Sequence, residues 1–153
     1  MRALLQRVAR ASVSVEGRAV AAIDHGMVVL LGVGKDDTEA DARYLAERCA
    51  SLRVFPDDSG KFNVSLLDTA GAALVVSQFT LYASTRKGRR PGFTDAAPPD
   101  VAEPLVEAFA RFLEACGVHV RTGIFQQHML VEIHNDGPVT VMVDSEQRHE
   151  PRH

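Results

Sequence analysis

Residues 27–33 form an apolar run of strand length, Met-Val-Val-Leu-Leu-Gly-Val. Seven residues suit a strand better than a helix, which usually needs ten or more. A strand that faces solvent on one side alternates apolar and polar residues, whereas a strand that is apolar throughout is covered on both faces. The run therefore predicts a buried, central strand in a sheet with other elements on each side.

Other segments have weaker strand patterns. Residues 2–9 and 12–15 alternate well enough for two short strands, and Glu16-Gly17 is a plausible hairpin turn into Arg18–Ile23. Pro56–Gly60 is a turn signal. Further strands are expected at Arg53–Phe55, Ala72–Leu81, Val118–Arg121, Met129–His134 and Val139–Val143.

Two segments have helical periodicity. Residues 38–52 repeat apolar side chains at helical spacing, and Thr38 stands three residues before Asp41 in a capping-box pattern. A second helix is expected to begin at Asp100, with Glu103 completing its cap. The residues on its core side are Leu105, Val106, Phe109, Phe112 and Leu113. Gly117 is the glycine expected to end the helix. The order of elements predicts a mixed α/β fold, a single compact domain of mixed β-sheets with two principal helices.

The composition is that of one globular domain. Of 153 residues, 46% are hydrophobic and 24% charged, enough to build one core over residues 1–145, with a polar, frayed tail at 146–153. No apolar run is long enough to span a membrane, and the first residues do not resemble a secretory signal. Cys49 and Cys116 fall inside helical patterns, which favours two reduced thiols over a disulfide. A cytoplasmic location is expected.

The charge distribution contains one basic cluster. The net charge of −3 argues against a protein that coats nucleic acid without regard to sequence, because such proteins are usually strongly basic. Within a loop of about fifteen residues rich in glycine, proline and arginine, four cations nevertheless lie close together: Arg86, Lys87, Arg89 and Arg90. Cations beside glycine fit contact with phosphates, so a weak nucleic-acid contact is one interpretation. A solvated surface loop is the other.

Polar side chains gather at the end of the strand expected at Ala72–Leu81. In an extended chain Gln78 and Thr80 would share one face, and Ser77 and Phe79 the other. Hydroxyl and amide groups so placed could bind a carbonyl or offer a nucleophile. Polar residues also mark strands that simply leave the core, so this segment alone does not identify a site.

Segment 135–140, Asn-Asp-Gly-Pro-Val-Thr, predicts a hairpin turn between two alternating strands. Its proline adds a second possibility, because an X-Pro bond adopts the cis form at modest cost. A cis bond between Gly137 and Pro138 could turn two neighbouring carbonyl oxygens the same way and so create a receptor for a primary ammonium group.

Several familiar chemistries have no support in the sequence. No Gly-x-Ser-x-Gly elbow surrounds Ser77, and Gly32-x-Gly34 is only a fragment of a phosphate-binding loop. The six histidines do not have metal-ligand spacing; His128 and His134 share a strand face at most. Neither a metal nor a cofactor is expected.

Segments 77–81 and 135–140 together resemble the two signature motifs of the D-aminoacyl-tRNA deacylase family, Ser-Gln-Phe-Thr-Leu and Asn-x-Gly-Pro-Val-Thr. The opening residues 1–15, the run 31–37 and the segment 85–91 with the following Ala-Ala-Pro-Pro are also typical of the family. The resemblance covers roughly residues 1–145. It implies a homodimer with active sites at the subunit interface, and a hydrolase that proofreads tRNA during translation.

The resemblance also implies roles for individual residues. Gly137-Pro138 would be a cis dipeptide that enters the partner subunit's site, and Arg7 would help to hold it there. The reaction centre would be lined by Ser77, Gln78, Phe79 and Thr80. Phe125 and Met129 would bracket the terminal adenine of tRNA, and the basic loop would make weak contacts with the tRNA.

These roles imply hydrolysis of the ester between a D-amino acid and tRNA, and of glycine mischarged on tRNA for alanine. An L-amino acid would drive its side chain into the Gly-Pro backbone, whereas a D-amino acid or glycine presents only hydrogen there. The main-chain N–H groups of Gln78 and Phe79 would support the oxyanion, assisted by the 2′-hydroxyl of the terminal adenosine. Thr80 as a nucleophile is the alternative, although no base is evident to activate it.

The segment 123–129 departs from the family pattern Gly-x-Phe-Gly-Ala-x-Met, because Gln126 and Gln127 replace two small residues beside the expected adenine pocket. A binding module of the same fold without turnover is therefore a second hypothesis. A third is an esterase for small metabolites, which the missing catalytic triad and the basic loop disfavour.

Overall fold

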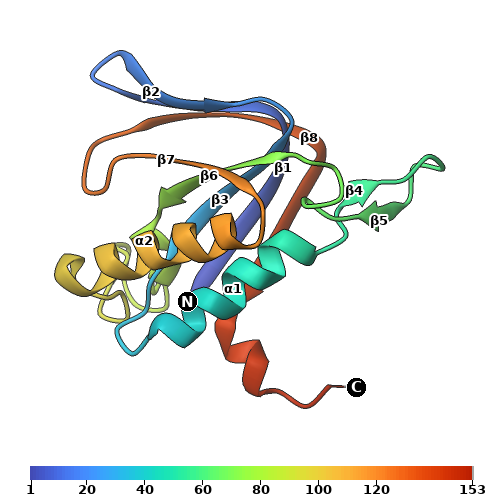
Figure 1. Cartoon of the computed structure of the whole chain (residues 1–153). Coiled ribbons are helices and arrows are strands. Elements are labelled where there is room, and N and C mark those ends of the chain that lie inside the picture. Colours follow the sequence, from blue (N-terminus) through green and yellow to red (C-terminus); the bar gives the residue numbers. More distant parts are fainter. Residues whose placement is uncertain (153) are drawn as a thin grey trace.

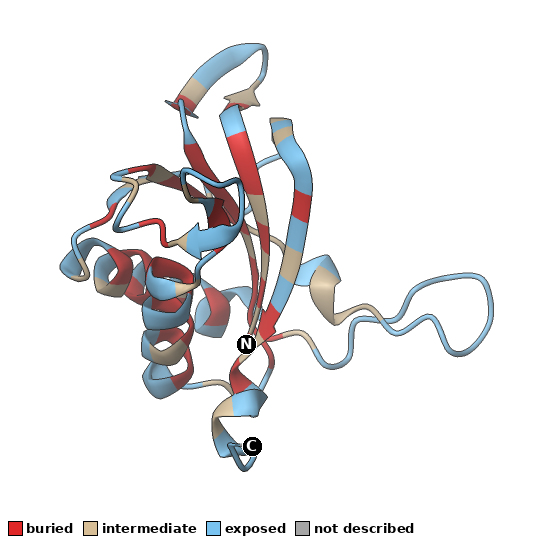
Figure 2. Ribbon diagram, turned by 90° about the vertical axis from the view of Figure 1, so that its right-hand side faces the viewer, coloured by how far each residue is buried: buried red, intermediate tan, exposed pale blue. Residues whose placement is uncertain are grey.

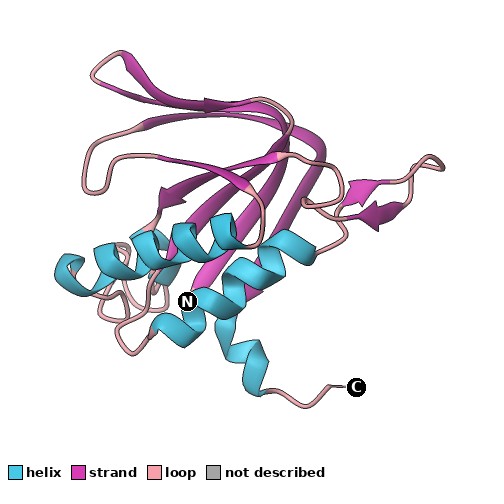
Figure 3. Ribbon diagram, in the orientation of Figure 1, coloured by secondary structure: helices cyan, strands magenta, loops and turns pink. Residues whose placement is uncertain are grey.

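The computed structural model describes residues 1–152, and its main part is a twisted sheet with two helices packed on one face (Figures 1 and 3). This is the expected mixed α/β fold. The elements in chain order are β1 (Arg2–Val15), β2 (Arg18–Ile23), β3 (Gly26–Gly32), α1 (Glu39–Ser51), β4 (Phe55–Pro56), β5 (Phe62–Val64), β6 (Ala72–Ser77), the 3-10 helix η1 (Phe79–Tyr82), α2 (Pro99–Ala115), β7 (His119–Thr122), β8 (Leu130–Asp144) and the 3-10 helix η2 (Ser145–His149).

The sheet has the order β2-β1-β3-β6-β7, and β8 also pairs with β1. The apolar run is confirmed as a central strand, because β3 runs antiparallel to β1 and parallel to β6. It is buried except at Leu30, which is half-buried. One core cluster lies under the helices and includes Leu5, Met27, Leu45, Phe109 and Leu113. A second is formed by β1, β2, β3 and β6 and includes Val8, Val13, Ile23, Val28 and Leu74.

The first strand is longer than predicted. The two short strands expected at 2–9 and 12–15 are one continuous strand, β1, with irregular register against β8 near Val8. The alternation of apolar and polar residues breaks there, but pairing with β3 and β8 holds the chain extended on both sides of the break. The predicted turn into β2 is confirmed, since Glu16 and Gly17 both have positive φ, 50° and 78°.

The two helices agree with the prediction except at one cap. The capping box of Thr38 and Asp41 at the start of α1 is present, and Gly117 follows α2 with φ 105°. The Asp100–Glu103 cap was wrong: Pro98 is the N-cap of α2, and no side chain caps it. Proline suits the start of a helix because the N–H groups there have no helical partner.

The two cysteines are free thiols, as the sequence favoured: Cys49 is buried in α1, and Cys116 is half-buried at the end of α2. Burial raises the pKa of the Cys49 thiol to about 12. No helix in the described part of the chain is long and apolar enough to cross a membrane.

Two short segments differ from the prediction. The strand expected at Arg53–Phe55 begins only at Phe55, and it pairs with β5, which the sequence did not indicate. The first half of the segment predicted as a frayed tail forms η2, where Arg148 Nη2 lies 3.5 Å from Asp41 Oδ1 of α1. His153, at the end of that predicted tail, lies outside the described residues.

The predicted hairpin at 135–140 was wrong. β8 runs through this segment without reversing, and both of its halves pair with β1. In the register, Val8 lies opposite Asn135 and Gln6 opposite Thr140. Residues 136–139 therefore face the single residue Arg7 as an outward bulge, which we call the 136–139 bulge. A turn signal in the local sequence here produces a bulge because the long strand β1 pairs on both sides of it.

Candidate active site

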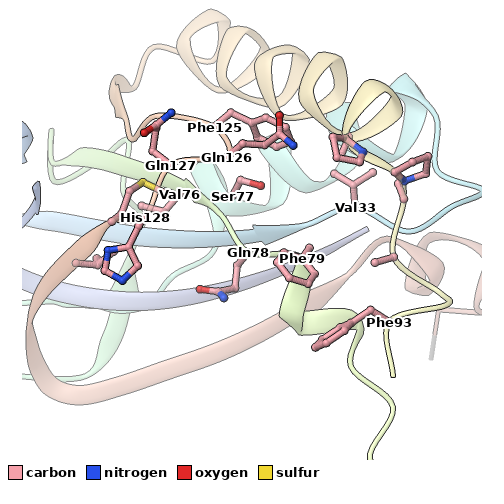
Figure 4. A pocket seen from close by; sticks show the side chains of 17 residues that line it. Val33, Val76, Ser77, Gln78, Phe79, Phe93, Phe125, Gln126, Gln127 and His128 are labelled. Atoms are coloured by element: carbon pink, nitrogen blue, oxygen red, sulfur yellow. The ribbon is translucent and has the colours of Figure 1, made fainter. Parts of the chain in front are cut away.

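A cavity of about 720 Å³ opens at the end of β6, between η1, the start of α2 and the segment before β8. Five predicted site residues line it: Ser77, Gln78, Phe79, Phe125 and Met129. In Figure 4 the segment from Phe125 to His128 lies on one side, with Gln78 and Phe79 on the other. Further lining residues include Val33, Val76, Phe93, Ala97, Pro98 and Ala102. The cavity is largely apolar, with hydroxyl and amide groups on its wall.

The predicted strand at 72–81 ends early, and this changes the geometry of the motif. β6 stops at Ser77, and the chain then turns into η1. The main-chain N–H of Gln78 donates to Leu31 O at 2.8 Å. The expectation that both main-chain amides face the substrate was therefore wrong for Gln78. The N–H of Phe79, the first residue of η1, is the remaining donor of the pair, because the first N–H groups of a helix lack a helical partner.

Two glycines of β3 and the loop after it allow η1 to approach the sheet. A Cβ on Gly32 would lie 3.0 Å from Gln78 O, and a Cβ on Gly34 would lie 3.1 Å from the Tyr82 ring. These contacts explain the Gly32-x-Gly34 pattern without any phosphate. Arg2 holds η1 from the other side, because its Nη1 donates to Leu81 O at 2.9 Å and its Cζ lies 4.5 Å from the Tyr82 ring centroid.

Thr80 is exposed and is not among the residues that line the cavity. Its hydroxyl oxygen accepts a hydrogen bond from the side-chain amide of Gln78. An amide donor stabilises the hydroxyl but cannot remove its proton, so this contact does not activate Thr80 as a nucleophile. The prediction that Gln78 and Thr80 share one face of a strand was wrong, because β6 ends at Ser77; the two side chains meet at the start of η1 instead.

Phe93 is a site residue that the sequence analysis missed. It lines the cavity from the long loop, and its ring packs edge-on against Phe79 with centroids 5.0 Å apart. The available signal was a large aromatic residue within an otherwise polar, glycine-rich and proline-rich segment. The pair forms an aromatic wall beside the Phe79 N–H.

The 136–139 bulge is closed by the first residue of its motif. Asn135 Oδ1 accepts from the Val139 N–H at 3.0 Å, and Asn135 Nδ2 donates to Thr140 Oγ1 at 3.1 Å. The asparagine side chain thus connects both ends of the bulge. The Gly137-Pro138 bond within it is cis, and both residues are exposed.

Arg7 lies opposite the bulge and is 8% exposed. Its Nε donates to Asp136 O at 3.0 Å, and its Nη1 donates to Val54 O at 2.9 Å. Arg7 therefore contacts the 136–139 bulge of its own chain, and its role in holding Gly137-Pro138 in a partner's site stays a prediction. However, neither Arg7 nor Gly137-Pro138 is among the residues that line the cavity of the same chain.

The rim of the cavity carries Gln126 and Gln127. Gln126, Gln127 and His128 all line it (Figure 4). Gln126 has φ 63°, a conformation in which glycine is favoured over residues with a side chain. The amides of both glutamines are exposed, so they add hydrogen-bonding groups where the pocket opens.

The basic loop stands out from the body of the molecule on the side of the sheet away from the helices (Figure 2). Its neck is closed by two main-chain hydrogen bonds between Ser84 and Gly92, at 2.7 and 2.9 Å. The four cations Arg86, Lys87, Arg89 and Arg90 are exposed, and in the described part of the chain none is in an ion pair. Among residues 1–152 no cluster of His, Cys, Asp or Glu could hold a metal ion.

The comparison with protein families assigns the chain to a family. The sequence model of the family described as D-Tyr-tRNA(Tyr) deacylase matches residues 4–144. The chain belongs to the D-Tyr-tRNA(Tyr) deacylase family. Membership identifies it as an enzyme, a D-aminoacyl-tRNA deacylase, and confirms the resemblance found in the sequence.

Individual relatives support the family assignment. The chain is 60% identical over 152 residues to a D-aminoacyl-tRNA deacylase of Roseiflexus castenholzii, covering 99% of this chain and 97% of the relative. It is 61% identical over 144 residues to one of Heliobacterium modesticaldum, covering 94% and 96%.

Solved structures show the same fold as this deacylase family member. A c-Myc DNA unwinding element binding protein has a TM-score of 0.88 and 39% identity, covering 94% of this chain and 98% of that one. A probable eukaryotic D-amino acid tRNA deacylase has a TM-score of 0.83 at 19% identity with the same coverage, which supports the fold alone.

Proposed function

We propose that this enzyme hydrolyses the ester between a D-amino acid and the terminal adenosine of tRNA, releasing the free D-amino acid and tRNA. It also removes glycine mischarged on tRNA for alanine, and it spares L-aminoacyl-tRNA. The observation that carries the proposal is the single cavity shared by Ser77, Phe79, Phe125 and Met129. Its apolar wall suits a base, and its polar wall suits an ester.

Residues 1–145 form the catalytic domain, and the enzyme works in the cytoplasm.

The adenine lies between Phe125 and Met129, which are both half-buried and give the cavity an apolar slot. Stacking on an aromatic ring and a thioether does not require a charged partner. This placement puts the ester beside Ser77 and the Phe79 N–H, at the other wall of the cavity.

Hydrolysis uses the substrate's own hydroxyl. A water molecule adds to the ester carbonyl carbon, and the bond from that carbon to the ribose oxygen breaks. The neighbouring ribose hydroxyl assists the proton transfers, and the released ribose oxygen gains the proton. The Phe79 N–H donates to the developing oxyanion. Thr80 takes no covalent part, because its hydroxyl accepts from Gln78 and no base among residues 1–152 is hydrogen-bonded to it.

Gly137-Pro138 from a second copy of the chain completes the site and excludes L-amino acids by steric clash. Two observations support this arrangement. Asp136, Gly137 and Pro138 of the bulge are exposed while its ends are held, and the bulge lies outside the cavity of its own chain. A side chain that points at this backbone has no room, whereas a hydrogen atom does.

The face of the sheet away from the helices supports a homodimer. Val139 and Val143 of β8 belong to the core under the helices. Met142, which alternates with them, points to the opposite face and is 45% exposed. Its neighbour in β1 is the half-buried Leu4. An apolar strip on this face suits burial against a second copy.

The basic loop contacts the phosphates of the tRNA. Its four cations Arg86, Lys87, Arg89 and Arg90 are exposed, and the loop that carries them extends on the side of the sheet away from the helices (Figure 2). Phosphate contacts position a nucleic acid without reading its sequence, so this contact adds affinity for any aminoacylated tRNA.

Three substrates test the class of reaction: D-tyrosyl-tRNA, glycyl-tRNA for alanine, and a small activated ester. We expect loss of both tRNA esters and no turnover of the small ester. Tight binding of D-tyrosyl-tRNA without turnover would instead support a binding module, and hydrolysis of the small ester alone would support a metabolite esterase. Sedimentation of the protein at micromolar concentration should give twice the mass of the chain, and a monomer would contradict the shared site.

A further inference from the structure

Phe62 lies over the arginine that holds the 136–139 bulge. Its ring centroid is 5.5 Å from Arg7 Cζ, within the range of a cation–π contact. The contact joins two parts of the chain that the sequence does not link, because Phe62 belongs to β5 and Arg7 to β1. Figure 1 shows the hairpin of β4 and β5 standing out beside β8.

Arg7 is held from three sides. Its Nε donates to Asp136 O in the bulge, and its Nη1 donates to Val54 O just before β4. The Phe62 ring lies against the guanidinium as the third contact. The remaining guanidinium nitrogen is close to the bulge as well, because a Cβ built on Gly137 would lie 3.3 Å from Arg7 Nη2. The guanidinium therefore sets where the backbone of Asp136 and Gly137 can lie.

The two partners of the contact between Phe62 and Arg7 differ in exposure. It is 57% exposed, which makes it the more exposed partner of a contact with a residue that is only 8% exposed. A large apolar side chain in water gains little by itself. Here the ring lies against one side of the guanidinium, and a hydrogen bond that does not compete with water is stronger.

We propose that Phe62 is a positioning residue for the stereochemical check: it shields Arg7 from water and thereby fixes the bulge that carries Gly137-Pro138. This inference rests on the proposed function of that dipeptide. Phe62 does not touch the substrate. It acts through Arg7, whose two hydrogen bonds transmit the constraint to Asp136 and to the segment before β4.

The test compares variants of the full-length enzyme. Phe62→Ala removes the ring, and Phe62→Tyr keeps both its area and its π face. Asn63→Ala is the matched control on the same strand: it removes contacts with Asp57 and Arg53 within the hairpin but none with Arg7. The first measurement is the ratio of hydrolysis rates for D-tyrosyl-tRNA and L-tyrosyl-tRNA.

We expect Phe62→Ala to lower this ratio by about two- to tenfold, the range of a partly exposed cation–π contact. Phe62→Tyr and Asn63→Ala should stay within about twofold of the wild type. A second measurement does not depend on the reaction: the exchange of the Arg7 Nε proton with water, followed by NMR, should be about two- to tenfold faster in Phe62→Ala alone.

Each outcome decides a separate point. An unchanged ratio and unchanged proton exchange in Phe62→Ala would overturn this inference while leaving the proposed function intact. A ratio that falls equally in Asn63→Ala would assign the effect to the hairpin as a whole and would also overturn it. A wild-type enzyme that hydrolyses both esters equally would overturn the proposed function together with the inference.

Discussion

The side-chain oxygen of Asn135 accepts a hydrogen bond from the main-chain N–H of Val139, 3.0 Å away and four residues further along the chain. Together with the bond from Asn135 Nδ2 to Thr140 Oγ1, it replaces the ladder pairing that β8 loses at the 136–139 bulge. An asparagine provides both an acceptor and a donor, which explains why this residue type opens the motif.

Asn135→Ala should destabilise the protein by about 1–3 kcal/mol, because the N–H of the buried Val139 loses its partner. Asn135→Asp should cost less, since it keeps the acceptor and loses only the donor to Thr140. Urea unfolding measures both. Equal stability of the alanine variant and the wild type would contradict the role of this side chain.

Gly137→Ala should be more harmful than an alanine at another glycine with positive φ. At Gly137 φ is 140°, and a Cβ would lie 2.7 Å from Val139 Cγ2 and 2.9 Å from Val139 N. We expect a loss of about 1–3 kcal/mol in unfolding free energy and a loss of D-ester hydrolysis. Gly88→Ala is the matched control, because φ there is 70° but no atom lies within 4 Å of the added Cβ.

Thr80→Val should retain hydrolysis of D-tyrosyl-tRNA within about tenfold, because the hydroxyl accepts from Gln78 and has no base to activate it. The variant keeps the shape of the side chain, so folding should be preserved. The measurement is the single-turnover rate of D-tyrosyl-tRNA hydrolysis by the variant and the wild type. A loss of about a thousandfold or more in a folded variant that still binds tRNA would make Thr80 the nucleophile.

Replacing Arg86, Lys87, Arg89 and Arg90 by glutamine should weaken tRNA binding and flatten its dependence on salt. Each lost phosphate contact lowers the slope of log Kd against log salt by about 0.7–0.9. Binding of uncharged tRNA at several salt concentrations measures the slope. Replacing the exposed Arg18 and Lys61 in the same way should leave it unchanged, and equal slopes in all variants would mean that the loop is simply solvated.

Local sequence patterns predicted the elements whose cause is local. The apolar run at 27–33 gave β3, Thr38 and Asp41 marked the start of α1, and Gly117 marked the end of α2. In each case the signal and the structure it determines lie within a few residues of each other.

The errors have causes that are distant in sequence. Residues 77–81 have strand character, but the chain leaves the sheet because Gly32 and Arg2 create a place for η1. The Asn-Asp-Gly signal predicted a reversal, but β1 pairs on both sides and turns it into a bulge. The residue that braces this bulge, Arg7, is 129 positions away from Asp136.

The candidate site was predictable only in part. The resemblance placed Ser77, Phe125 and Met129, and the structure brings them to one cavity. Phe93 was missed because its importance comes from packing against Phe79, which no local pattern encodes. The contact between Phe62 and Arg7 was not predictable either, since the sequence did not indicate the pairing of β4 with β5.

We propose that the backbone at Gly137-Pro138 checks the handedness of the amino acid. The most direct test is the rate at which the wild-type enzyme hydrolyses D-tyrosyl-tRNA and L-tyrosyl-tRNA under identical conditions. We expect a preference for the D-ester of at least about a hundredfold, since a steric clash of a few kcal/mol gives a factor of that size. Comparable rates for the two esters would contradict it.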